Sequence, residues 1–263
     1  MIKDPLTPTV LELIGKATGL CDKEAWNNIW LLISKSEHDN TDPDKAFLDD
    51  KGKSLFGFCS ALSYDYAKRG CTLGIVGWTT ADSGRDGKGD APELFRQYKN
   101  LGGDDLMPYV AGCTKSKTAC KKLIEKIHAI ADDPKWIQAQ FENLVTGDGY
   151  LAKAVGAWKK VGVEKPSALA IAVVFDTSLN LAYDGADGGC THLIKIATKG
   201  NEEKTLHDYC KWKAKVSGKN EYNDPPINGV NRGKMFLKLV EAKCFTLKNC
   251  DKELQEAMSW TMK

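Results

Sequence analysis

The segment that decides the fold is Tyr64–Thr80, which reads YDYAKRGCTLGIVGWTT. Its β-branched and aromatic residues lie between small ones, and glycine recurs at Gly70, Gly74 and Gly77. Short apolar runs divided by glycines are typical of strands that are joined by tight turns. From Phe56 to the end of this segment, the pattern therefore predicts a small antiparallel hairpin or three-stranded sheet.

Most of the remaining chain has a helical pattern. Thr9–Glu12 reads as a capping box that opens a first helix, and Lys23–Ser36 carries apolar residues at helical spacing. A succession of helices is expected within Thr118–Gly162, and a last amphipathic helix at Lys234–Ala242. Ser167–Leu181 is almost unbroken in its apolar character, which predicts a buried helix.

Composition and charge restrict the function classes. The 263 residues are 42% hydrophobic and 27% charged, which is ordinary for a globular protein. The net charge of +2 names no partner, and the lysines between 115 and 126 read as a solvated helix face without a nucleic-acid motif. No apolar run reaches the roughly 18 to 20 residues that span a bilayer. We therefore expect neither a nucleic-acid partner nor a membrane partner.

The cysteines predict disulfides rather than a metal site. None of the nine forms a Cys-x-x-Cys pair or a Cys/His group at zinc-finger spacing, so we expect no metal. Since no phosphate-binding glycine loop is present either, we expect no cofactor. The separations Cys113 to Cys120 and Cys244 to Cys250 suit local disulfides, which favours a secreted protein. The alternative is a reduced intracellular protein with buried thiols.

Glu37 is the candidate catalytic acid. Trp26, Ile29, Trp30 and Ile33 follow helical spacing, and Glu37 continues the same apolar stripe. Partial desolvation at this position is expected to raise the pKa of the carboxyl and suit it to donate a proton near neutral pH. The alternative is a glutamate at the end of a helix whose head group reaches water.

The segment Tyr64–Thr80 resembles the active-site hairpin of family 46 chitosanases. In that family a glutamate at a helix end is followed by an Arg-Gly-x-Thr segment, by glycines before an aromatic residue, and by a further aspartate. The matching positions here are Glu37, Arg69, Gly70, Thr72, Gly74, Gly77, Trp78 and Asp90. Ala168–Asp176 is similar to the core helix of the family's larger lobe, and Asn231–Lys238 is similar to its late arginine-bearing helix.

This resemblance implies an α+β, mainly α, lysozyme-like fold in which residues 1–263 form one two-lobed catalytic domain. The minor lobe, with the hairpin, would span about 23–105, and the larger helical lobe about 106–263 plus the N-terminal helix. The implied activity is that of a secreted, monomeric, endo-acting glycoside hydrolase that cleaves β-1,4-linked glucosamine polymers with inversion. The alternatives are a muramidase-like or chitin-directed hydrolase on the same fold, and a non-catalytic carbohydrate-binding relative.

The sequence departs from the family pattern at the general base. The family's catalytic aspartate falls on Ala67, and we predict that Asp65 takes its role, because a bulge of one or two residues would move it to that place. The rival positions are Asp49, Asp50, Asp82, Asp86 and Asp90. Residues 81–89 read as an inserted glycine-rich loop at the rim of the cleft.

Four further residues are expected to act at the site. The resemblance implies that Thr72 helps to hold the attacking water, and we expect Tyr64, Arg69 and Asp90 to contact the substrate. Arg69 would orient a carboxylate through a bidentate contact, or else it is an exposed turn residue. The tryptophans at 26, 30 and 78 would stack on sugar rings or, as the helical pattern favours for the first two, belong to the core.

Overall fold

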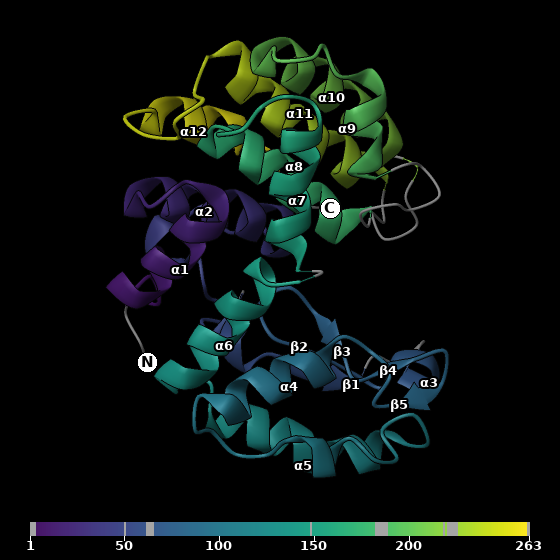
Figure 1. Ribbon diagram of the computed structural model, residues 1–263. Helices are drawn as coiled ribbons and strands as arrows, with labels where there is room; N and C mark the ends of the chain where they lie inside the picture. Colours follow the sequence, from purple (N-terminus) through teal and green to yellow (C-terminus); the bar gives the residue numbers. More distant parts are fainter. Residues whose placement is uncertain are drawn as a thin grey trace. The chain divides into compact units, whose positions relative to one another are not determined.

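The computed structural model describes residues 4–49, 51–61, 66–147, 149–181, 189–217, 219 and 226–261 (Figure 1). Its helices are α1 Pro8–Thr18, α2 Lys23–His38, α3 Tyr66–Arg69, α4 Ala91–Asn100, α5 Lys117–Ala129, α6 Pro134–Val145, α7 Tyr150–Lys160, α8 Ala168–Asn180, α9 Thr191–Ile196, α10 Glu202–Ser217, α11 Pro226–Glu241 and α12 Asp251–Ala257. Its strands are β1 Cys59–Ala61, β2 Cys71–Leu73, β3 Trp78–Thr79, β4 Ala81–Asp82 and β5 Arg85–Asp86. Short 3-10 turns form η1 Pro43–Lys45, η2 Leu55–Gly57 and η3 Met107–Tyr109.

The chain divides into two compact units. Unit 1 comprises residues 1–10 and 47–143, and unit 2 comprises residues 11–46 and 144–263. These boundaries differ from the expected lobes, since residues 106–143 fall in unit 1 and residues 23–46 in unit 2.

The sheet of unit 1 lies where the sequence predicts it. Strands β1, β2 and β3 form an antiparallel sheet in that order, with Ser60 opposite Thr72 and Thr72 opposite Thr79. The short helix α3 separates β1 from β2, so part of the segment expected to be extended is helical. Thr72 is therefore the middle residue of the central strand.

The turn between β2 and β3 is fixed by a glycine and by α6. Gly74 has φ +73°, and a Cβ atom there would lie 2.7 Å from both the Trp78 ring and the Gln140 amide oxygen. Gln140 Oε1 accepts a hydrogen bond from the Ile75 backbone N–H at 3.0 Å, and Trp78 Nε1 donates to Asn143 at 2.8 Å. Helix α6 thus holds the turn that aligns the strand carrying Thr72.

Residues 81–89 form a second hairpin rather than an irregular loop. Ala81 pairs with Asp86, and Asp82 pairs with Arg85. Ser83 and Gly84, between the strands, have φ +50° and +79°, the left-handed pair that a tight two-residue hairpin turn requires.

Unit 2 is built around α8. Residues 168–178 of this helix are all buried, and Ser167 caps it by accepting a hydrogen bond from the Ala170 N–H at 3.2 Å. Helices α2, α7, α10 and α11 pack against it, and α10 and α11 lie side by side (Figure 1). The expected buried helix is therefore confirmed.

Helix α2 places the candidate acid. Asp22 accepts a hydrogen bond from Ala25 N–H at 2.9 Å, and the apolar stripe of the helix is buried, with Trp30 edge-on to Phe175 of α8 at 5.4 Å. The helix ends where Asp39 adopts φ +55°. Glu37 therefore sits in the last turn of a helix whose position is fixed by core packing.

Other helices refine the sequence prediction. The region 118–162 contains the separate helices α5, α6 and α7. The helix expected at Lys234–Ala242 begins earlier, as α11, and it is not the last helix, because α12 follows it. The first helix is capped by Thr7, whose Oγ1 accepts from Val10 N–H at 3.3 Å, and not by Thr9. Among the helices that the structure describes, none is long and apolar enough to cross a bilayer.

Candidate active site

The Glu37 carboxylate is held by Arg232. Arg232, on α11, donates through Nη2 to Glu37 Oε1 and through Nη1 to the Ser36 carbonyl oxygen at 3.4 Å. The same guanidinium binds Asp176 of α8 in a bidentate manner, with Nε 2.9 Å from Oδ2 and Nη2 2.8 Å from Oδ1. Because a bidentate contact fixes the plane of a guanidinium, Asp176 determines the direction in which Arg232 meets Glu37.

Asp176 is the buried centre of this network. It is 0% exposed, and Lys213 Nζ, equally buried on α10, lies 2.8 Å from its Oδ2. Burial disfavours the ionised carboxylate, but Arg232 and Lys213 outweigh that effect and hold the pKa of Asp176 below its ordinary value. Burial also lowers the pKa of Lys213, and Asp176 opposes that shift. The pair of cations is therefore balanced by Asp176 and Glu37.

Glu37 itself is less buried than the helical pattern predicts. Its side chain is 41% exposed, whereas that of Arg232 is 5% exposed. The sequence predicted partial desolvation of this carboxyl, and the structure leaves it accessible to solvent, although Ser34, Lys35 and Ser36 before it are buried. Glu37 is therefore a solvent-accessible carboxyl that Arg232 holds in place.

A second contact secures the end of α2. Lys35 is only 2% exposed, forms an ion pair with Asp39 and donates to the Trp260 carbonyl oxygen. Its ammonium group also lies 4.5 Å from the centre of the Trp260 ring. The turn that carries Glu37 is thus fixed on one side by Arg232 and on the other by the C-terminal segment.

In unit 1, Thr72 lies on β2, and Asp90, just before α4, binds the neighbouring strand β3. The Thr72 hydroxyl oxygen is buried and has no hydrogen-bond partner among the described residues. Thr79, its neighbour on β3, donates to Asp90 Oδ1 from its backbone N–H at 2.5 Å and from its hydroxyl at 3.3 Å. Arg69 ends α3 and is exposed, while Tyr64 and Asp65 lie outside the described residues.

Four of the six aspartates considered for the general base are engaged in holding backbone or hairpin structure. Asp49 accepts from the N–H groups of Lys51 and Lys53, and Asp82 contacts Ser83 within the second hairpin. Asp86 accepts from Gly112 N–H at 2.6 Å and Thr114 N–H at 3.0 Å, and Asp90 binds Thr79. The other two candidates, Asp50 and Asp65, lie outside the described residues.

The tryptophans considered as sugar platforms belong to the core. Trp26 and Trp78 are 0% exposed and Trp30 is 2% exposed. The indole N–H of Trp26 donates to the Leu20 carbonyl oxygen at 2.7 Å. None of these three rings can therefore stack on a sugar.

The cysteines are thiols in this structure. All nine are free, and eight of them are buried, so the disulfides expected at Cys113–Cys120 and Cys244–Cys250 are not present. Buried thiols were the alternative reading of the sequence.

Lys213 is the member of this buried network that the sequence did not indicate. It lies on α10, a helix for which no pattern was identified, and a lysine in a polar helix normally faces water. Asp176 and Arg232 were singled out through the helices that carry them, without a role for either side chain. No local pattern in the sequence indicates that these three residues meet.

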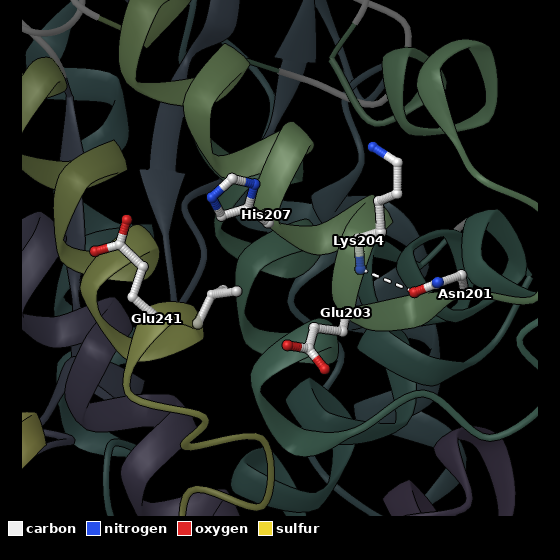
Figure 2. Close-up of a pocket in the computed structure, with 6 residues that line it drawn as sticks. Asn201, Glu203, Lys204, His207 and Glu241 are labelled. Atoms are coloured by element: carbon white, nitrogen blue, oxygen red, sulfur yellow. Dashed lines mark hydrogen bonds between the residues drawn. The ribbon is translucent and has the colours of Figure 1, made fainter.

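A polar pocket on unit 2 lies between α10 and the end of α11 (Figure 2). Its lining residues are Asn201, Glu203, Lys204, His207, Val240 and Glu241. Figure 2 shows the Lys204 backbone N–H donating to Asn201 Oδ1, a bond of 3.0 Å. The Lys204 ammonium pairs with Asp208 at 2.8 Å, and Glu203 lies 3.7 Å from Lys243. Glu37 is not among the residues that line this pocket.

Known proteins resemble this chain in both sequence and fold. No family model matches the chain. A chitosanase of Niallia circulans is 31% identical over 279 residues, which cover 99% of this chain and 85% of that protein. The crystal structure of native chitosanase from Bacillus subtilis MY002 matches with a TM-score of 0.60 at 20% identity, over 87% of this chain and 93% of the other.

A structure of a Gynuella sunshinyii GH46 chitosanase in complex with chitotetraose matches with a TM-score of 0.63 at 17% identity, over the same shares of the two chains. These likenesses confirm the expected mainly α lysozyme-like fold with its small antiparallel sheet. The nearly full-length sequence match identifies the family, and chitosanases are glycoside hydrolases. The chain therefore belongs to the chitosanase family, with the fold of the family 46 enzymes.

Proposed function

We propose that the chain is an endo-acting hydrolase of β-1,4-linked glucosamine polymers that works with inversion, with Glu37 as the general acid. The observation that carries this proposal is the Glu37–Arg232–Asp176–Lys213 network. It anchors a solvent-accessible carboxyl at a helix end through a guanidinium whose own counterion is fully buried. A proton donor must be held in one position relative to the leaving oxygen, and this arrangement does so.

The chemistry requires one carboxylic acid and one carboxylate. The Glu37 carboxyl gives its proton to the glycosidic oxygen as the bond from that oxygen to C1 of the sugar breaks. A water attacks C1 from the opposite face, and the base carboxylate accepts its proton. The products are a sugar with an inverted anomeric centre and a new hydroxyl on the leaving chain. Thr72 binds the attacking water, and its buried hydroxyl, which has no hydrogen-bond partner among the residues that the structure describes, supports that role.

Asp65 remains our choice for the base. Asp49, Asp82, Asp86 and Asp90 are each bound to backbone N–H groups or within a hairpin, where a structural role accounts for them. This leaves Asp50 and Asp65, and Asp65 directly precedes α3 in the strand connection that leads to Thr72. Tyr64 and Arg69 flank this segment, and we propose both as substrate contacts.

The substrate class follows from relatives and from local charge. The relative from Niallia circulans is a chitosanase, and a Bacillus subtilis MY002 variant was crystallised with 6 GlcN. Chitosan is a polycation, and the region around the hairpin of this chain is rich in aspartate. A secreted, monomeric enzyme would meet such a polymer outside the cell, and we propose that setting for this chain.

The test is the release of reducing ends from chitosan, chitin and peptidoglycan by the purified chain. The proposal expects preferential cleavage of chitosan, with early NMR spectra that show the α-anomer. Preferential cleavage of peptidoglycan or chitin would assign that polymer as the substrate in place of chitosan. Binding without cleavage would show that the chain is a non-catalytic carbohydrate-binding relative. Early spectra with the β-anomer would reject inversion.

The base is tested by alanine substitution in the same assay. Asp65→Ala should abolish turnover without changing the melting temperature. Asp49→Ala and Asp82→Ala are matched controls from the same unit, and they should keep most of the turnover. Near-normal turnover of Asp65→Ala with loss in Asp50→Ala would assign the base to Asp50.

A further inference from the structure

Four cysteines from separate segments meet inside unit 1. Cys59 lies on β1, Cys71 on β2, Cys113 after η3, and Cys120 near the start of α5. Cys71, Cys113 and Cys120 are 0% exposed, and Cys59 is 7% exposed. The proposed hydrolytic chemistry uses none of them.

Three of the four sulfur atoms form a compact group, and Cys59 adjoins it. The Sγ atoms of Cys71, Cys113 and Cys120 all lie within 4.8 Å of one another, and Cys71 Sγ is 4.0 Å from Cys113 Sγ. Cys59 lies beside Cys71 across the paired strands β1 and β2. The sheet register explains that placement, because Cys71 pairs with Ala61 and Cys59 lies two residues along the same face of β1.

The spacing fits a tetrahedral metal site. Thiolates bind Zn²⁺ at about 2.3 Å, which places the sulfurs of a tetrahedral site roughly 3.8 Å apart. The Cys71–Cys113 separation of 4.0 Å is close to that value. Cys71 has the sulfurs of Cys113 and Cys120 within 4.8 Å and Cys59 beside it in the sheet, an arrangement centred on one thiol, whereas disulfides would join the four thiols as two separate pairs.

A catalytic thiol does not account for the cluster. Reactive cysteines are accessible and have a lowered pKa. Here Cys71, Cys113 and Cys120 are fully buried, so a substrate cannot reach them.

We propose that Cys59, Cys71, Cys113 and Cys120 form a structural site for a thiophilic divalent cation of the zinc type. Soft thiolate ligands select such an ion over Mg²⁺ or Ca²⁺, and a closed set of four protein ligands is typical of structural sites. The sequence predicted no metal because the ligands come from a strand pair, a loop and a helix, without the short Cys-x-x-Cys spacing. Ligation would also protect the thiolates from oxidation outside the cell.

The ion would brace the sheet that carries Thr72. Strand β2 supplies both Cys71 and Thr72, and α5, which supplies Cys120, packs against β1. The loop around Cys113 is already held by Asp86, which accepts the N–H groups of Gly112 and Thr114. Loss of the ion would therefore loosen β2 without removing any group that contacts the substrate.

The experiment uses the full chain, purified under reducing conditions and loaded with Zn²⁺ or Co²⁺ before gel filtration. Elemental mass spectrometry should find one bound ion per chain, and the Co²⁺ form should show thiolate charge-transfer bands with the intense visible absorption of tetrahedral cobalt. Zn²⁺ should raise the melting temperature of the reduced apoprotein. Cys71→Ser and Cys113→Ser should lose the bound metal, whereas the unit 2 controls Cys21→Ser and Cys244→Ser should retain it.

Two results on the wild-type chain would overturn the proposal. One is a reduced protein whose four thiols react freely and that keeps no Zn²⁺ after gel filtration. The other is a natively purified protein in which these thiols are protected, no metal is present, and the mass is short by two hydrogens for each disulfide. Both results are independent of whether a serine variant folds and of whether the chain hydrolyses chitosan.

Discussion

The substitution Asp176→Asn tests the buried network most severely. The amide keeps the shape of the carboxylate but removes the one negative charge that, among the described residues, pairs with both Arg232 and Lys213, and all three side chains are at most 5% exposed. Removing one partner of a buried ion pair typically costs about 3 to 5 kcal/mol, because the remaining charge is left uncompensated. Here two cations are left, so we expect a loss at the upper end of that range.

The loss is measured as the free energy of unfolding from urea titrations, followed by fluorescence and circular dichroism together. Lys213→Met should cost less, within about 2 kcal/mol, because the Asp176–Arg232 pair stays complete and a buried ammonium is removed. Asp208→Asn, in an exposed pair with Lys204 on the same unit, should stay within about 1 kcal/mol of wild type. If Asp176→Asn also unfolds within about 1 kcal/mol of wild type, the network does not stabilise unit 2 as argued.

Three further predictions concern Asp176, Thr72 and Gly74. The pKa of Asp176 is held below its ordinary value of 3.8. The contribution of Asp176 to stability is therefore complete above that pH and is lost as the pH falls further. In acid unfolding, the stability of Asp176→Asn should fall less steeply below about pH 4 than that of wild type. Thr72→Val should leave the melting temperature unchanged or higher, since it removes a buried hydroxyl that has no partner within the described part of the chain. Its turnover should fall on the order of tenfold or more, and a fully active Thr72→Val enzyme would contradict the role of Thr72 in binding the water. Gly74→Ala should lower the free energy of unfolding by about 1 to 2 kcal/mol or more, because φ +73° disfavours a side chain and the new Cβ would collide with Trp78 and Gln140. An unchanged free energy of unfolding in urea titration would contradict this turn geometry.

Local patterns in the sequence predicted the helices and strands better than the contacts between them. The glycines around Thr72 specify a small sheet, and the apolar run at Ala168–Asn180 specifies a buried helix, because both signals lie within a few neighbouring residues. Thr7 replaced Thr9 as the first cap because either hydroxyl could serve, and only tertiary packing decides where the helix begins.

The site depended on contacts between distant segments. Helical spacing and the family resemblance pointed to Glu37 as the candidate acid, but the apolar stripe could not show how far its side chain reaches solvent. Lys213 gave no signal, since a buried lysine on a polar helix is recognised only once Asp176 lies opposite it. The cysteines were misread for the same reason, because their grouping depends on strand register and on α5 packing.

Glu37→Gln tests the central claim most directly. The glutamine keeps an oxygen that accepts from Arg232, and the site is 41% exposed, so folding and chitosan binding should stay near wild type. Hydrolysis should fall by on the order of a hundredfold or more, because the amide has no proton to give to the leaving oxygen. The measurement is reducing-end release from chitosan alongside binding of the same polymer and the melting temperature. A folded Glu37→Gln protein that binds chitosan and retains more than about a tenth of wild-type turnover would contradict the assignment of Glu37 as the general acid.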